Sequence, residues 1–161
     1  MTAITSEDIW RLLDEVKDPE IPVVSIVDLG IVREVKVDGR KATIILTPTF
    51  AGCPALYAIR DEVLRTLLQA GVTDTDVRFS YSPPWSSDDL TPQARQKLKE
   101  LGIAPPASHH GLIGLAELLP MPCPYCDSTN TTLKNEYGPT LCRAIYFCNN
   151  CNQPFEQFKS I

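Results

Sequence analysis

The sequence predicts an α+β protein in which a small sandwich of helices and strands is followed by a cysteine-rich C-terminal domain. Amphipathic, helix-like runs and β-rich runs alternate between residues 6 and 82. Five of the six cysteines lie at position 123 or later, in a segment of different composition. The chain has 161 residues, of which 43% are hydrophobic, so it is long enough for one ordinary domain or two small ones.

The N-terminal region begins with a predicted helix and a predicted β-hairpin. Apolar residues recur at helical spacing over 6–17, with Thr5 and Ser6 as candidate N-caps, and the two prolines that follow prevent the helix from continuing. The β-rich runs 31–37 and 42–48 are joined by an Asp-Gly turn, which is a strong hairpin signal because glycine accepts a positive φ.

A second helix and a third strand complete the expected sandwich. The helix is expected over 54–71, with Pro54 at its first position and Gly71 just past its end. A strand over 76–82 follows a short polar turn. This helix–hairpin–helix–strand order predicts helices on one face of a three-stranded sheet.

The sequence then becomes irregular before the cysteine-rich end. A short helix is expected over 91–102, with Thr91 as its N-cap and Pro92 at its first position. Proline, glycine and serine are frequent over 105–120, which indicates a linker. We therefore expect three segments: an N-terminal domain at 1–84, a short helix and linker at 85–119, and a C-terminal domain at 120–161.

Two Cys-x-x-Cys pairs in the C-terminal segment predict a metal site. The ligands would be Cys123, Cys126, Cys148 and Cys151. The pairs are 21 residues apart, slightly more than the roughly 15 to 20 residues usual for a four-cysteine zinc site. Hairpin arms at 130–137 and 142–148 would bring the two knuckles together as a zinc ribbon.

The chemistry of this site has alternatives. A structural Zn²⁺ would explain how so short a segment folds, but four thiolates also accept iron. Two disulfides or a redox pair are disfavoured by a reducing compartment and by the absence of a βαβ unit. Cys142, six residues before the second pair, is a packed free thiol, a spare ligand or an additional cluster ligand, and the first reading is favoured.

Cys53 stands alone between a strand-like run and a helix-like run. It is a buried apolar plug, a catalytic nucleophile, or a ligand that handles metal or sulfur. A thiolate just before a helix is favoured by the helix dipole and by free backbone N–H groups, and Gly52 before it favours exposure. His109 and His110 lie in the linker, where we expect them to face solvent, so a Cys–His catalytic pair is poorly supported.

Three acids, Asp18, Glu20 and Asp28, lie between the first helix and the hairpin. They are turn residues by default, and an acidic rim near another site is the alternative. No Gly-rich phosphate loop and no serine nucleophile elbow occurs in the chain. These absences count against an autonomous enzyme.

Charge and hydropathy exclude several partners. The net charge is −5 and no lysine or arginine block occurs, so the basic footprint of a nucleic-acid-binding protein is absent. No apolar run is long enough to span a bilayer, and the N-terminus lacks the features of a secretory signal. We expect a cytoplasmic protein with no nucleic-acid or membrane partner, and we leave open whether it acts as a homodimer.

The stretches "DPEIPVVSIVDLGIV" and "TPTFAGCPA" resemble the small domain of the SufT-type iron–sulfur assembly family. On that resemblance Asp18, Pro19 and Glu20 match the family's DPE loop, Asp28, Leu29 and Gly30 match its DLG turn, and Cys53 with Pro54 matches its Cys-Pro. The resemblance implies that Cys53 handles metal or sulfur, as a transient Fe or Fe–S ligand. Asp18, Glu20 and Asp28 are implied only as nearby motif residues.

The remaining motifs, "SPPWSSDDLTPQARQKLKELGIAPP", "CPYC" and "CRAIYFCNNCNQPFEQFK", resemble the PaaD family of accessory proteins of the phenylacetyl-CoA epoxidase system. This resemblance implies a maturation factor of aerobic phenylacetate degradation, which assists iron–sulfur or iron assembly on the reductase or oxygenase subunit. A structural subunit of the epoxidase complex is the alternative, and an independent thiol enzyme is less favoured. No Glu-x-x-His di-iron motif occurs in the chain, so catalysis of its own is not expected.

Overall fold

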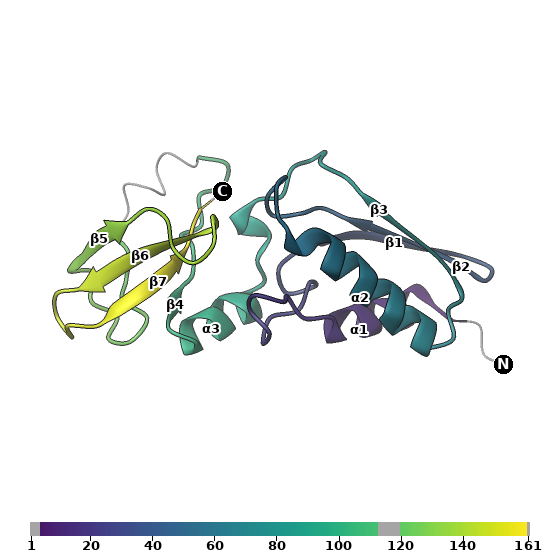
Figure 1. Ribbon diagram of the computed structural model, residues 1–161, viewed down its shortest axis with the longest axis horizontal. Helices are drawn as coiled ribbons and strands as arrows, with labels where there is room; N and C mark the ends of the chain where they lie inside the picture. The colour runs from purple at the N-terminus through teal and green to yellow at the C-terminus, as the bar shows by residue number, and fades with distance from the viewer. Residues whose placement is uncertain (1–3, 113–119, 161) are drawn as a thin grey trace. The chain divides into compact units, whose positions relative to one another are not determined.

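The computed structural model describes residues 4–112 and 120–160. It divides into two compact units, Met1–Trp85 and Ser86–Ile161, which we call the N-terminal and C-terminal units. Part of the expected linker, residues 113–119, lies outside the described residues. Figure 1 labels the helices and strands of both units.

The N-terminal unit is a three-stranded sheet with two helices packed against it. Its elements are α1 (Ser6–Glu15), β1 (Val32–Asp38), β2 (Lys41–Leu46), α2 (Ala55–Gln69) and β3 (Asp74–Phe79). The sheet order is β1-β2-β3, with β1 antiparallel and β3 parallel to the central β2. Figure 1 shows α2 lying along this sheet with α1 beside it. The predicted α+β class, the hairpin and both helices are confirmed.

Local signals explain where these elements begin and end. Thr5 caps α1 in a reciprocal capping box with Asp8. Gly39, in the hairpin turn, has a φ of 60°, as the Asp-Gly signal predicts. Pro54 is the N-cap of α2, one residue earlier than expected, whereas Gly71 follows the C-cap with a φ of 88°, as predicted.

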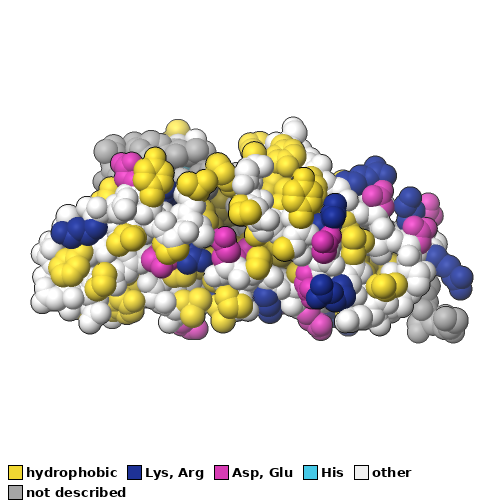
Figure 2. All heavy atoms as spheres, viewed as in Figure 1, with side chains coloured by type: hydrophobic (Ala, Val, Ile, Leu, Met, Phe, Trp, Pro, Cys, Tyr) yellow, Lys and Arg dark blue, Asp and Glu magenta, His cyan; other side chains and the backbone are white. Residues whose placement is uncertain are grey.

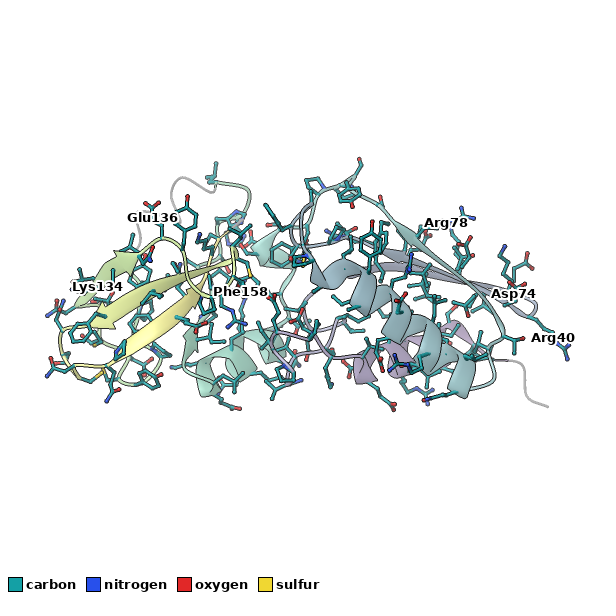
Figure 3. The ribbon with its side chains drawn as sticks, in the orientation of Figure 1. Arg40, Asp74, Arg78, Lys134, Glu136 and Phe158 are labelled. Carbon is teal, nitrogen blue, oxygen red and sulfur yellow. The ribbon has the colours of Figure 1, made fainter. Side chains whose placement is uncertain are left out.

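The core of this unit is built from alternate residues of β2 and from one stripe of each helix. Its members include Ile9, Leu13, Ala42, Ile44, Leu46, Ile59, Val63 and Leu67, all nearly or fully buried. The strand expected over 76–82 is instead Asp74–Phe79, because the parallel ladder starts opposite Lys41 and ends where β2 ends at Leu46. Charged side chains such as Arg40, Asp74 and Arg78 point away from the sheet (Figure 3).

The C-terminal unit contains a short helical segment and a four-stranded sheet. Its elements are the 3₁₀ turn η1 (Ser87–Asp89), α3 (Pro92–Glu100), β4 (Ile103–Ala104), β5 (Thr131–Asn135), β6 (Arg143–Cys148) and β7 (Pro154–Phe158). The sheet order is β4-β7-β6-β5. The predicted hairpin arms are β5 and β6, and α3 begins after Thr91 with Pro92 as its first residue, as expected.

Sequence analysis did not anticipate β4 and β7. β7 pairs antiparallel with β6, and the two residues of β4 pair parallel with β7, so α3 and β4 belong to the same compact unit as the ribbon. No helix in the described residues is long and apolar enough to cross a membrane.

Candidate metal centre and the Cys53 loop

Four cysteine sulfurs converge at one end of the C-terminal sheet. The Sγ atoms of Cys123, Cys126, Cys148 and Cys151 all lie within 4.8 Å of one another. The Cys123 and Cys151 sulfurs are 3.7 Å apart, and the Cys126 and Cys148 sulfurs are 3.6 Å apart. Four sulfurs bound tetrahedrally to one ion at about 2.3 Å would be about 3.8 Å apart. The donor set therefore fits one tetrahedral metal ion, as the spacing of the two pairs predicts.

The two pairs sit in knuckles with the same hydrogen bonding. The backbone N–H of Cys123 donates to the carbonyl of Ser128, and that of Cys148 donates to the carbonyl of Gln153, each at 2.9 Å. In each knuckle the first cysteine is buried and the second is half-buried. This repetition places two thiols from each knuckle on the same side, facing the other pair.

Backbone and burial tune the thiols in opposite directions. Backbone N–H groups of Cys151 and Asn150 lower the pKa of Cys148 to about 6, although burial opposes them. Burial raises the pKa of Cys123, and burial together with the neighbouring thiols raises the pKa of Cys151 to about 12. Near neutral pH the metal-free cluster therefore holds protonated thiols, and metal binding must release protons.

The segment that precedes the ribbon supports the first knuckle. Ala104 of β4 packs with Met121 and Phe155 around the buried Cys123 and Cys148. Lys99 of α3 forms an ion pair with Asp127, at 2.6 Å. Tyr125 lies directly against Gly102, where a Cβ would collide with its ring and hydroxyl. The metal centre and α3–β4 thus share one packed surface.

Cys142 lies outside the group of four sulfurs. It is half-buried, and its Sγ lies 3.1 Å from the Thr140 hydroxyl. In the structure it is therefore a packed thiol that does not join the four-sulfur cluster.

Cys53 is a half-buried thiol in the loop before α2. Its N–H donates to the carbonyl of Phe50 at 3.1 Å, and its carbonyl accepts from the N–H of Leu56 at 3.2 Å. No side chain caps the N-terminus of α2, and its first turn holds no acid. Such a terminus has backbone N–H groups and a positive dipole end that favour an anion.

Aromatic side chains surround this loop. Phe50 and Tyr57 are 44% and 62% exposed, and the Phe50 ring lies close against Gly52. Figure 2 shows hydrophobic side chains gathered over the N-terminal end of α2. Exposed aromatic residues of this kind are enriched at protein–protein interfaces.

Asp18 and Asp28 both build turns. The Asp18 carboxylate accepts hydrogen bonds from the N–H groups of Glu20 and Ile21, at 2.8 and 2.9 Å. Asp28 is buried and exchanges hydrogen bonds with Ser25, whose N–H donates to the Asp28 carboxylate and whose Oγ accepts from the Asp28 N–H. Glu20 is exposed.

The structure does not gather Cys53 and these acids into a metal-binding group. Within the described residues, the four-cysteine cluster is the one place where three or more His, Cys, Asp or Glu ligand atoms converge. The roles of Cys53, Asp18, Glu20 and Asp28 in handling metal therefore stay predictions.

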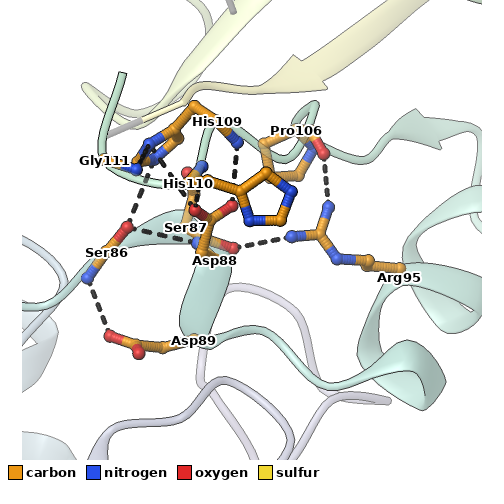
Figure 4. A network of polar contacts seen from close by, with 9 residues as sticks. All are labelled: Ser86, Ser87, Asp88, Asp89, Arg95, Pro106, His109, His110 and Gly111. Atoms are coloured by element: carbon orange, nitrogen blue, oxygen red, sulfur yellow. Dashed lines mark hydrogen bonds and ion pairs between the residues drawn. The ribbon is translucent and has the colours of Figure 1, made fainter. Parts of the chain in front are cut away.

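A polar network that sequence analysis missed surrounds His109 (Figure 4). The expectation that both histidines face solvent is correct for His110 and wrong for His109, which is buried. The Asp88 carboxylate accepts from the N–H groups of both histidines, at 3.1 and 2.7 Å. Because the Gly111 N–H donates to Nδ1 of His109, a neutral ring carries its proton on Nε2, which lies 3.2 Å from the Ser86 hydroxyl.

This network attaches the chain after β4 to the η1 turn. Burial opposes the charge on Asp88, but hydrogen bonds from the backbone N–H groups of His109 and His110 outweigh it and lower the pKa of Asp88. The sequence signal available was the capping pattern of Ser86 and Asp89 around η1, which marks an ordered turn in a segment that otherwise reads as a linker.

Comparison with known families matches both units. Residues 6–78 match the model of an iron–sulfur cluster assembly protein family, and residues 109–159 match the model described as the PaaD zinc beta ribbon domain. The two matches leave residues 79–108 between them, including α3 and β4.

Similar proteins agree with this division. A PaaD-type protein of Escherichia coli, named as a putative 1,2-phenylacetyl-CoA epoxidase component, is 43% identical over 96% of this chain and 92% of its own length. The Fe-S protein maturation auxiliary factor YitW of Bacillus subtilis is 38% identical over 59% of this chain and 94% of its own.

A solved structure supports the fold of the N-terminal part. The crystal structure of a domain of unknown function, DUF59, from Bacillus anthracis is similar at a TM-score of 0.55 and 31% identity, covering 58% of this chain and 90% of that one. The chain therefore belongs to the PaaD family, and it joins an iron–sulfur assembly domain to a zinc ribbon with a four-cysteine cluster.

Proposed function

We propose that this chain is a maturation factor of a multicomponent phenylacetyl-CoA 1,2-epoxidase, assisting iron–sulfur cluster or iron assembly on its reductase or oxygenase subunit. The observation that carries the proposal is the joining of two similarities in one chain. The region similar to named Fe-S maturation factors is continuous with a chain that resembles the Escherichia coli epoxidase component over nearly its full length. The substrate system comes from the second similarity and the assembly role from the first.

Within this function, Cys53 is the residue proposed to hold the iron or cluster in transit. Its thiol precedes the uncapped N-terminus of α2, where the helix dipole and free N–H groups favour a thiolate. The exposed aromatic residues Phe50 and Tyr57 beside it provide apolar surface for a client protein. Asp18 and Asp28 support the function by building the turns of their motifs.

Zinc is the metal we propose for the four cysteines. Their thiols fit a closed tetrahedral site without an open position, which is typical of structural zinc. When bound, the metal supplies the cross-link that holds the two knuckles together. The hydrogen bonds from backbone N–H groups and the apolar cover of Ala104, Met121 and Phe155 orient the thiols and limit their access to water.

A second function, that of a structural subunit of the epoxidase without metal transfer, is favoured by one observation. Cys53 does not converge with two or more other metal-ligating side chains among the described residues. A cluster on Cys53 would thus need ligands from a client or a second copy, whereas a structural subunit needs none.

Substituting Cys53 separates the two functions. The variant Cys53→Ser is co-expressed with the epoxidase subunits, with Cys142→Ser as a matched control that removes a thiol outside both sites. Iron and acid-labile sulfide are measured in each purified subunit, and assembly is followed by size-exclusion chromatography. We expect Cys53→Ser to deplete the client's iron or cluster while the complex still assembles.

Other outcomes decide against that function. If the clients of Cys53→Ser keep full metal content, the assembly role of Cys53 is wrong. If metal content stays full but the complex fails to assemble when this chain is omitted, the structural-subunit function is supported instead.

A further inference from the structure

The turn built by Asp18 forms one wall of a groove that the proposed function does not use. The groove has a volume of about 390 Å³ and lies between the end of α1, the loop after it and α2. Its lining residues are Glu15, Lys17, Asp18, Pro19, Pro22, Ala58, Ile59 and Glu62. Every one of them belongs to the N-terminal unit.

The floor of the groove is apolar and rigid. Pro19 and Pro22 stand on the loop side, and Ala58 and Ile59 stand on the α2 side. The loop is held by hydrogen bonds from Glu20 and Ile21 to the Asp18 carboxylate and by the bond from the Asp18 N–H to the Val24 carbonyl, at 2.9 Å. A preorganised floor of this kind lowers the entropy cost of binding an aliphatic chain.

The rim of the groove is acidic. Three carboxylates, from Glu15, Asp18 and Glu62, face one ammonium group, that of Lys17. The Lys17 ammonium donates to the Asp14 carbonyl, at 2.8 Å, at the end of α1. Glu62 forms an ion pair with Arg65, but both side chains are largely exposed, and an exposed pair of this kind is weak enough to be exchanged.

We propose that this groove receives an arginine side chain of a partner protein. An arginine has an aliphatic stem suited to the proline, alanine and isoleucine floor, and a planar guanidinium suited to carboxylates on opposite walls. Under the proposed function the partner is an epoxidase component, and only this identification depends on that function. The arginine-binding chemistry of the groove stands on its lining residues alone.

The test uses the full-length, zinc-loaded protein and a defined probe. A blocked glycine–arginine–glycine peptide is titrated into ¹⁵N-labelled protein at low salt, and a peptide with citrulline in place of arginine is the neutral, isosteric comparison. We expect millimolar binding of the arginine peptide, with amide shift changes confined to residues 15–22 and 58–62. The citrulline peptide should bind at least threefold more weakly, and added salt should weaken only the arginine peptide.

Variants separate the charge of the rim from the shape of the floor. The double variant Glu15→Gln/Glu62→Gln should weaken arginine binding about threefold to tenfold. The control Glu7→Gln/Glu136→Gln removes the same charge at exposed positions outside the groove and should leave binding unchanged. Ala58→Leu keeps the charges but fills the groove from the exposed face of α2, and it should weaken both peptides.

Three results would overturn the proposal: equal binding of the two peptides, shift changes outside the groove, or wild-type affinity in the double glutamine variant. The Cys53→Ser variant should bind the arginine peptide as the wild type does. Failure of Cys53→Ser to change the metal content of a client therefore refutes the proposed function without touching the groove. Loss of arginine selectivity refutes the groove without touching Cys53.

Discussion

Asp127 and Asn152 occupy equivalent positions, each directly after the second cysteine of a knuckle, and both have a φ of 57°. This left-handed conformation turns the chain so that the N–H of the first cysteine reaches a carbonyl five residues further on. Asp and Asn tolerate the conformation better than other residues with a side chain, whereas β-branched residues do not. The two knuckles therefore depend on residue types that the Cys-x-x-Cys pattern does not specify.

A β-branched residue at position 152 should weaken the metal site. We expect Asn152→Val to destabilise the loaded C-terminal unit by about 1 to 2 kcal/mol, the usual cost of this backbone conformation. Asn152→Gly should be nearly neutral because glycine adopts a positive φ freely. Zinc affinity, measured by competition with a chromophoric chelator, checks both. Equal affinity of the valine and glycine variants would contradict the proposed role of the turn.

Metal removal should unfold one unit and spare the other. Cys148→Ser, or chelation of the wild type, should abolish amide-exchange protection in β4, β6 and β7, because the cysteines are part of that unit's small core. Protection in β1–β3 should persist, since those strands have a separate core. Hydrogen exchange followed by mass spectrometry measures both units in one sample.

Cys142→Ser is the matched control for that experiment. It removes a half-buried thiol of the same unit that lies outside the four-sulfur cluster. We expect one metal ion per chain in Cys142→Ser, as in the wild type, by elemental analysis. A loss of metal in this variant would show that Cys142 is a ligand after all.

Trp85 ties the DLG turn to the end of the N-terminal unit. Its indole N–H donates to the Leu29 carbonyl at 2.8 Å, and both residues are buried. Trp85→Phe should reduce the free energy of unfolding of this unit by about 1 to 3 kcal/mol, because a buried carbonyl loses this donor. Trp10→Phe, at a half-buried position of α1, should cost less in the same denaturant titration.

The capping box of α1 predicts a pH dependence. Hydrogen bonds from the Thr5 N–H and hydroxyl lower the pKa of Asp8 below its ordinary value of 3.8. Because the folded pKa is below the unfolded one, the stabilisation is present above about pH 4 and is lost as the pH falls through the folded pKa. Asp8→Asn should therefore reduce amide protection in α1 at neutral pH but not in strong acid, as hydrogen exchange at the two pH values would show.

A nearby acid provides the comparison for Asp8. Glu7 lies in the same first turn and experiences the same helix dipole, but it is not the partner of Thr5 in the capping box. Glu7→Gln should change α1 protection less than Asp8→Asn at neutral pH. Equal effects of the two variants would mean that the dipole, rather than the capping box, accounts for the stabilisation.

Much of the fold was predictable because its signals are local. The caps Thr5 and Thr91, the Asp-Gly turn and the Cys-x-x-Cys spacing each act over a few residues, and the structure places them as expected. Strand ends were less predictable, because β3 extends only where β2 offers a partner. The two-residue β4 has no periodicity of its own and exists through its pairing with β7.

By itself the sequence determined the α+β class, the two cysteine knuckles and the candidate thiol Cys53, since these depend on residue type and short-range spacing. Tertiary structure decided that α3 and β4 join the ribbon, that His109 is buried against Ser86 and Asp88, and that the acids of the two motifs build turns. The physical reason is that burial and pairing depend on partners distant in sequence. The acidic groove beside α2 likewise exists only because the loop after α1 folds back against that helix.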